Sequence, residues 1–118
     1  AKVKFFCQNN KLNFKEEPNI SFQIDSENYQ FQFDFLFYKN NVFVKLLKKR
    51  RIRHWALNFR VIKEYQGNNG APKLVAFYSD KEDVDKNLIK KWFGTHIDGI
   101  FNFNKEKIQI LNFLEKTE

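Results

Sequence analysis

Several residue types are scarce in this chain of 118 residues, which contains one cysteine, no methionine, four glycines and two prolines. The single cysteine, Cys7, excludes an internal disulfide and a zinc site made of four cysteines. We expect Cys7 to be a small core residue. The four glycines are too scattered to form a phosphate-binding P-loop.

Long apolar runs are also absent. The longest, Leu74 to Tyr78, has about five residues, whereas a transmembrane helix needs roughly 20. No short apolar segment follows a basic start near Ala1, so the sequence predicts no secretory signal peptide. We therefore expect an intracellular protein, in the cytoplasm or nucleus, without a membrane partner. Because the first residue is alanine, we expect either a removed initiator methionine or a fragment of a longer protein.

The composition, 42% hydrophobic and 30% charged, is typical of a globular chain of one domain. Alternating apolar residues in the first half predict two short, weakly patterned strands and three longer ones, at 2–6, 12–14, 20–24, 29–38 and 42–47. Turn residues at 25–28 and 40–41 separate the three longer strands. The first half therefore predicts an antiparallel three-strand meander.

Residues 51–66 fit two patterns. A helix would place five apolar side chains on one face, at Ile52, Trp55, Ala56, Phe59 and Ile62. A strand would instead align Trp55, Leu57, Phe59 and Val61. The length of the segment favours the helix.

The rest of the chain alternates between the two kinds of element. After a loop at 68–72, the pattern predicts a strand at 74–78 and a helix begun by a capping box of Ser79 and Glu82, with Val84, Leu88 and Trp92 on one face. A strand at 97–103 and a last helix from Asn104 to Leu114 follow. We therefore predict a single α+β domain over residues 1–118. Its mixed sheet would combine the antiparallel three-strand meander with a helix and a β-α-β unit.

The positive charge is concentrated in one stretch. The formal net charge is +7, and residues 35–63 contain nine cations and no acid, whereas acids outnumber cations by two in the rest of the chain. Such a block can neutralise phosphates and release their counterions, which indicates a nucleic-acid partner. The alternative is a solvated basic face that only keeps the protein soluble. The candidate binding residues are Lys45, Lys48, Lys49, Arg50, Arg51, Arg53, Arg60 and Lys63.

Aromatic residues are abundant, with 15 phenylalanines among them. Exposed aromatic rings stack on bases in proteins that bind single strands. In residues 29–37, however, the aromatic residues alternate with mostly polar ones, which is typical of a strand with one buried face. We expect most of these rings in the core. An aromatic sheet face that docks a protein partner is a further alternative.

Three segments carry a resemblance to a known family. Residues 16–22 read Glu-Glu-Pro-Asn-Ile-Ser-Phe, residues 33–36 read Phe-Asp-Phe-Leu, and residues 42–48 read Val-Phe-Val-Lys-Leu-Leu-Lys. Together with the order of elements, this text resembles the PD-(D/E)XK nuclease superfamily, particularly the endonucleases of Tn7-type transposons. The resemblance covers about residues 16 to 80. It implies a restriction-endonuclease-like fold, DNA as the partner and a link to mobile elements.

The resemblance assigns catalytic positions to Asp34 and Lys48. In such nucleases carboxylates hold Mg²⁺, and the lysine orients water and stabilises charge. The position of the second acid falls on Leu46, which cannot bind a metal, so the resemblance implies a degenerate site without a cofactor. The alternative is an active Mg²⁺-dependent nuclease in which the missing acid comes from Glu16, Glu17 or Glu64.

The turn between the second and third strands decides what faces Asp34. A three-residue turn at 39–41 would place Asp34 opposite Leu46, on the same face as Lys48. A two-residue turn at 40–41 would place Asp34 opposite Leu47, with Lys49 on its face. Either arrangement leaves Asp34 beside a lysine, for which a cross-strand ion pair is an ordinary explanation.

The two histidines, His54 and His96, lie 42 positions apart with no second ligand at metal spacing, so we expect neither to be catalytic. His54 lies within the basic stretch and could contact a phosphate. The sequence thus favours a domain that binds nucleic acid, with DNA as the favoured target. Such a domain would position a larger protein or a partner enzyme on its substrate. The active nuclease and the protein-interaction module remain the two alternatives.

Overall fold

The computed structural model describes residues 2–66 and 72–115 of the chain. These residues form four α-helices, α1 (Lys2–Asn9), α2 (Ile52–Gln66), α3 (Lys86–Phe93) and α4 (Lys107–Glu115). They also form seven strands, β1 (Phe14–Glu16), β2 (Asn19–Ile24), β3 (Glu27–Gln32), β4 (Phe35–Phe37), β5 (Val42–Leu46), β6 (Lys73–Tyr78) and β7 (Gly99–Asn102). Three short 3-10 helices lie between them, η1 (Tyr38–Asn40), η2 (Lys49–Arg51) and η3 (Asp80–Glu82).

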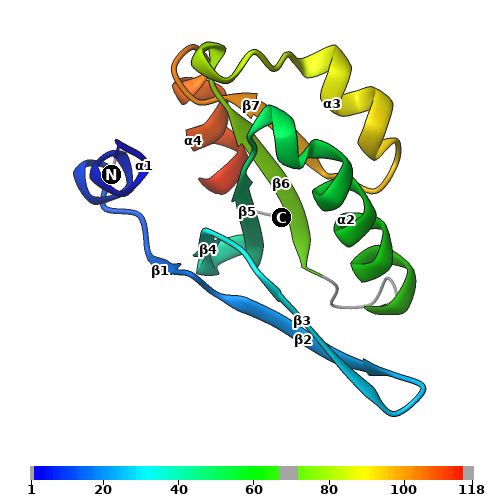
Figure 1. Ribbon diagram of the computed structural model, residues 1–118. Helices are drawn as coiled ribbons and strands as arrows, with labels where there is room; N and C mark the ends of the chain where they lie inside the picture. The colour runs from blue at the N-terminus through cyan, green and yellow to red at the C-terminus, as the bar shows by residue number, and fades with distance from the viewer. Residues whose placement is uncertain (1, 67–71, 116–118) are drawn as a thin grey trace.

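Five strands form a mixed sheet in the order β1-β4-β5-β6-β7 (Figure 1). The pairs β1–β4 and β4–β5 are antiparallel, whereas β5–β6 and β6–β7 are parallel. The predicted α+β class and the mixed sheet are confirmed. No helix among the described residues is long and apolar enough to cross a membrane.

One long, bent hairpin supplies both the edge of this sheet and a separate two-stranded ribbon, β2–β3. The register is continuous, because Phe14 faces Phe37 in the sheet and Asn19 faces Gln32 in the ribbon. Across the bend, the Glu17 N–H donates to the Asp34 carbonyl at 3.0 Å. At the far end, the two turn residues Asp25 and Ser26 have φ values of 50° and 70°, as a type I′ hairpin turn requires. The strand predicted at 29–38 is therefore bent, with its halves in β3 and β4.

The turn between β4 and β5 is longer than either predicted turn. Phe37 faces Val42, and the four residues between them include η1 and Asn41, whose φ is 53°. Both predicted registers are therefore wrong. Continuing this register by one step places Asp34 opposite Lys45, because the 3-10 turn takes up more residues than a tight hairpin loop.

Several predicted boundaries are also wrong. Residues 2–6 belong to helix α1, where Val3 and Cys7 are buried one helical turn apart. Helix α3 begins after Asp85, whose carboxylate accepts the Leu88 N–H at 2.8 Å, and Ser79 makes no side-chain cap. The buried residues of α3 are Ile89 and Phe93, so Trp92 is left exposed.

The last helix begins at Lys107 rather than at Asn104. The N–H groups of Asn104 and Lys105 instead bind the side-chain oxygen of Asn102, which holds the chain in a turn. Most of the loop predicted at 68–72 lies outside the described residues.

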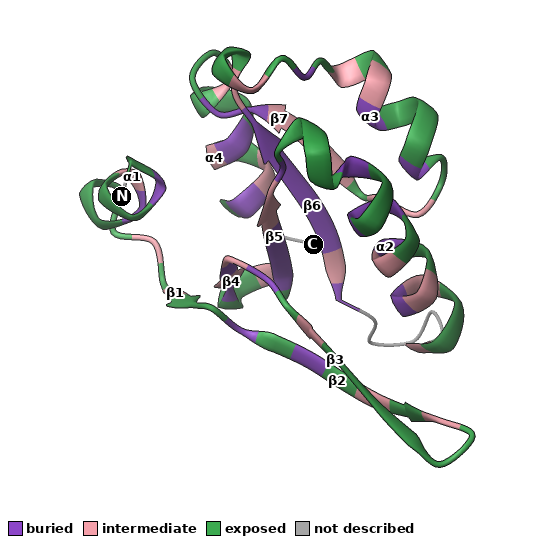
Figure 2. Ribbon diagram, in the orientation of Figure 1, coloured by how far each residue is buried: buried purple, intermediate pink, exposed green. Residues whose placement is uncertain are grey.

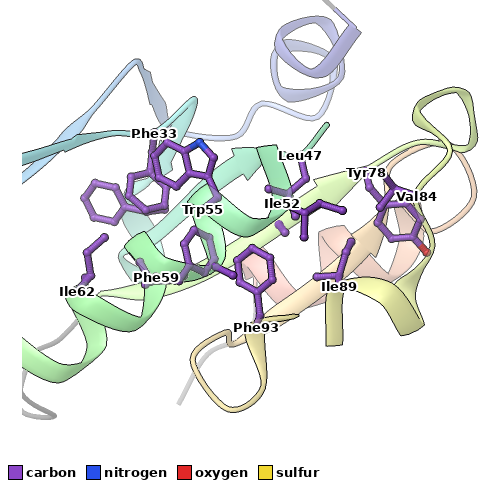
Figure 3. Packing of buried hydrophobic residues seen from close by; sticks show 14 of the residues in the cluster. Phe33, Leu47, Ile52, Trp55, Phe59, Ile62, Tyr78, Val84, Ile89 and Phe93 are labelled. Carbon is purple, nitrogen blue, oxygen red and sulfur yellow. The ribbon is translucent and has the colours of Figure 1, made fainter. Parts of the chain in front are cut away.

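The core has two halves, one on each face of the sheet. Helices α2 and α3 cover one face, and α1 and α4 contribute Val3, Cys7, Ile110 and Leu114 to the other. The buried residues of α2 are the five predicted from the helical pattern. Phe33 lies beside Trp55 and Phe59, at ring-centroid distances of 5.2 and 5.6 Å (Figure 3). The Phe43 ring is also 5.6 Å away. Of the 21 aromatic residues, ten are buried and six more pack partly buried against the core. The β2–β3 ribbon, in contrast, is largely exposed (Figure 2).

Candidate nucleic-acid interface

Five exposed cations lie where β5 ends and α2 begins. Here the buried side chains of Leu47 and Ile52 anchor the two ends of a 3-10 turn, and the Leu47 N–H donates to the Phe77 carbonyl at 2.9 Å. Side chains between and just after these anchors have no core to enter, so they point into solvent. We call these five cations the basic cluster: Lys48, Lys49, Arg50, Arg51 and Arg53.

Two members of the basic cluster have partners within the protein. Lys49 pairs with Asp83 at 2.8 Å, an exposed contact that raises the pKa of Lys49 and lowers that of Asp83. The Arg53 guanidinium lies over the Trp92 ring, 4.8 Å from its centroid. Within the described residues, no acid pairs with Lys48, Arg50 or Arg51. These three charges are available to an external anion.

The basic cluster lies at the N-terminus of the 15-residue helix α2. A helix carries a partial positive charge at this end, so acids are favourable there and cations are not. The first turn of α2 contains no acid. The cations therefore add to the positive potential of the helix end, an arrangement that weakens the free helix and favours a bound anion.

Each of the other three predicted binding residues pairs with an acid of the protein itself. Lys45 is half-buried, lies 3.6 Å from the Asp34 carboxylate and sits over the Trp55 ring at 4.3 Å. Arg60 pairs with Glu64 one helical turn away at 3.1 Å. Lys63 pairs with Asp98, whose carboxylate also accepts the Leu74 N–H. We therefore assign these three cations structural contacts and restrict the interface to the basic cluster.

The predicted catalytic residues do not share a site. The Asp34 carboxylate accepts the Leu46 N–H at 2.7 Å and pairs with Lys45 on the face covered by α2. The Leu46 side chain packs on the opposite face, against the half of the core built by α1 and α4. Lys48 lies beyond the end of β5, in the lining of a cleft that does not include Asp34. Asp34 thus forms a cross-strand ion pair, but its partner is Lys45 rather than Lys48 or Lys49.

The acids considered as replacements lie in other contacts. Glu16 pairs with Lys4 at 3.3 Å, and Glu64 pairs with Arg60. Glu17 is exposed at the bend of the hairpin. Across residues 2–66 and 72–115, no three histidine, cysteine or acidic residues are grouped so that they could hold a metal ion.

A cleft of about 340 Å³ opens beside the basic cluster, at the carboxyl ends of β5 and β6. It contains Lys48 and two lysines that the sequence analysis missed, Lys2 from α1 and Lys81 from η3. The residues lie far apart in the sequence, so no local charge pattern joins them. The usable signal was topological, because ligands bind at the carboxyl ends of parallel strands in open α/β sheets.

One wall of the cleft is held by polar contacts that centre on Asp80. The Asn102 amide, which is buried, donates to Asp80 at 2.9 Å, and Asp80 also pairs with Lys105 at 3.0 Å, which lowers the Asp80 pKa. These contacts hold η3, and with it Lys81, against the end of β7. Burial raises the pKa of the neighbouring Tyr78 hydroxyl.

The remaining sequence candidates lie away from the cleft. His54 is exposed in the first turn of α2, next to Arg53 of the basic cluster, and His96 is half-buried near the start of β7. Cys7 is buried, as predicted, and burial raises its thiol pKa from 9.0 to about 11. This thiol stays protonated at neutral pH.

The β2–β3 ribbon differs in charge from the rest of the molecule. It contains Asp25 and Glu27 and no cation. One of its faces carries Phe22, Tyr29 and Phe31, and the Phe22 ring centroid lies 6.5 Å from that of Tyr29 and 5.7 Å from that of Phe31. The ribbon therefore lies outside the positive surface.

No family model, curated protein or solved structure matches this chain.

Proposed function

We propose that this chain is a nucleic-acid-binding domain whose target is DNA, and that the basic cluster is its contact surface. One observation carries the proposal. Exposed cations, three of them without an acid partner among the described residues, gather at the positive end of α2. This placement is unfavourable for the isolated helix, and a bound phosphate backbone removes the conflict.

Counterion release sets the expected salt dependence of the affinity. A protein that neutralises Z phosphates of B-DNA binds with a log–log salt slope of about −0.9Z. If all five cations of the basic cluster contact phosphates, the slope reaches about −4.5. Phosphate contacts carry no sequence information, so we expect binding that is largely independent of sequence.

The order of elements supports a restriction-endonuclease-like origin. If the bent hairpin is counted as two strands, three antiparallel strands are followed by a helix, a parallel strand and a further helix. This is the order of elements expected from the family that the sequence resembles. We propose binding without hydrolysis, because Asp34 holds β5 in place and the position that the resemblance assigns to the second acid is Leu46, whose side chain lies on the opposite face. The domain would then position a larger protein or a partner enzyme on DNA. Cleavage with Mg²⁺ that disappears in Asp34→Ala would contradict this part of the proposal.

The β2–β3 ribbon favours a second function, docking of a protein partner. Its exposed Tyr29 ring and acidic tip suit a protein surface better than a phosphate backbone. Salt separates the two functions, because phosphate binding weakens steeply as salt rises and an apolar contact responds little.

The proposal is tested with a labelled duplex and three proteins. We expect Arg50→Glu with Arg51→Glu to weaken binding strongly and to flatten its salt dependence. Lys11→Glu with Lys39→Glu is the matched control, because it changes the net charge equally at exposed lysines that line a separate pocket beside η1. Fluorescence anisotropy between about 50 and 200 mM salt measures both effects. Equal losses in the two variants would reduce the interaction to net charge and refute the basic cluster as the interface.

A further inference from the structure

The cleft at the carboxyl ends of β5 and β6 brings together three lysines from separate elements. Lys2 comes from the start of α1, Lys48 follows β5, and Lys81 belongs to η3. In the described part of the chain, none of the three forms an ion pair. Nearby cations differ, since Lys4, Lys49 and Lys105 each have an acid partner.

The lining of the cleft therefore carries more positive than negative charge. Glu82 is the one acid among the described residues that line it, against three lysines. Like charges that converge on a partly enclosed site repel one another, and low-dielectric walls concentrate the resulting potential. An anion of more than one charge is the ligand that such a site favours.

The lining also limits the size and character of the ligand. A volume of about 340 Å³ lies at the small end of the range for small-molecule pockets. The side chains of Val3, Phe77 and Phe103 provide apolar wall, and Ser79 and Asn104 provide polar groups. An apolar wall beside a cationic rim fits a compact molecule with a planar or apolar body and one strongly charged group.

We propose that this cleft binds the phosphate monoester of a single nucleotide, with the phosphate on Lys2, Lys48 and Lys81. A monoester carries nearly two negative charges at neutral pH, whereas each phosphate within a strand is a diester with one. Lys48 belongs both to the cleft and to the basic cluster, so a strand held on the basic cluster can place its terminal phosphate in the cleft. The strand-end form of this inference rests on the proposed function.

The test compares duplexes that differ only at their ends. We expect a duplex with terminal phosphates to bind about fivefold more tightly than the same duplex with terminal hydroxyls. Lys81→Gln should abolish this difference and leave the affinity for the hydroxyl-ended duplex unchanged, because Lys81 lies outside the basic cluster. Lys2→Gln, on a different element, should act in the same way. The matched control is Lys39→Gln, which should preserve the difference.

A second measurement separates a strand end from a free nucleotide. Adenosine monophosphate, and adenosine as the probe without phosphate, are titrated while amide chemical shifts are followed. Shifts at residues 79–82 that the monophosphate causes, and that disappear in Lys81→Gln, support the phosphate site. If these shifts occur but no duplex binds, the proposed function fails and the phosphate site stands. A preference for phosphorylated duplexes without nucleotide binding supports a strand end as the source. Equal binding of both duplexes, together with no response to the monophosphate, overturns the inference and leaves the proposed function standing.

Discussion

Reversing the charge of Arg50 and Arg51 should weaken DNA binding and stabilise the fold in the same variant. The two residues immediately precede Ile52, the first residue of α2. A charge at a helix end contributes about 0.3–1 kcal/mol, unfavourably for a cation at the N-terminus and favourably for an acid. Exchanging two cations for two acids at this exposed position should therefore stabilise the protein by roughly 1 kcal/mol, with relief of the repulsion from Lys48 as an additional gain.

The same exchange removes two phosphate contacts. The salt slope should become shallower by about 1.8, because each contact contributes about 0.9. Over a fourfold rise in salt, the affinity of the variant should therefore fall roughly tenfold less than that of the parent.

Thermal melting and fluorescence anisotropy on the same preparations provide the readouts. A gain of 1 kcal/mol should raise the melting temperature by about 4 °C for a domain of this size. The control variant, Lys11→Glu with Lys39→Glu, should keep most of the affinity. A loss of 1 kcal/mol or more in Arg50→Glu with Arg51→Glu would show that the arginines support the fold, and would refute the conflict between helix and charge on which the proposal rests.

Three further outcomes test the fold around this surface. Phe33→Ala should cost about 3–5 kcal/mol in chemical unfolding, because a buried ring among three other aromatic rings leaves a cavity. Asp34→Ala should cost about 2 kcal/mol by losing the hydrogen bond from Leu46 and the pair with Lys45, whereas Asp34→Asn, which keeps an oxygen acceptor, should cost less; equal losses would contradict this role. The pKa of the Cys7 thiol is higher in the folded than in the unfolded protein. Its contribution to the free energy of unfolding is therefore complete below about pH 9 and is lost as the pH rises towards 11. The stability difference between the parent and Cys7→Ala should shrink over that window, and a constant difference would show that the thiol is not protected.

Local patterns predicted the elements that are amphipathic. Helix α2 was predicted from five apolar positions, and all five are buried. The antiparallel pairing in the first half and the parallel pair of β6 and β7 followed from alternation and from the apolar run of residues 74–78. The strand predicted at 20–24 nevertheless lies in the β2–β3 ribbon, outside the mixed sheet. Helix α1 was missed because its eight residues bury only Val3 and Cys7, too few to separate a helical period from an alternating one.

The candidate site was harder to predict, for two physical reasons. The length of a turn fixes the register of the strands that it joins. Because the turn that contains η1 is longer than predicted, the residue opposite Asp34 is Lys45 rather than Leu46 or Leu47. The cationic stretch was visible in the sequence, but the contacts that neutralise Lys45 and Lys63 come from distant residues. The same long-range contacts place Lys2 and Lys81 beside Lys48.

Mapping of the DNA contact by amide chemical shifts tests the central claim most directly. A short duplex is titrated into the labelled protein at low salt, and the shift of each assigned amide is followed. The basic-cluster account predicts that the largest changes lie at residues 48–53 and disappear when salt is raised. Changes centred on the β2–β3 ribbon or around Lys11 and Lys39, or changes that persist at high salt, would contradict it.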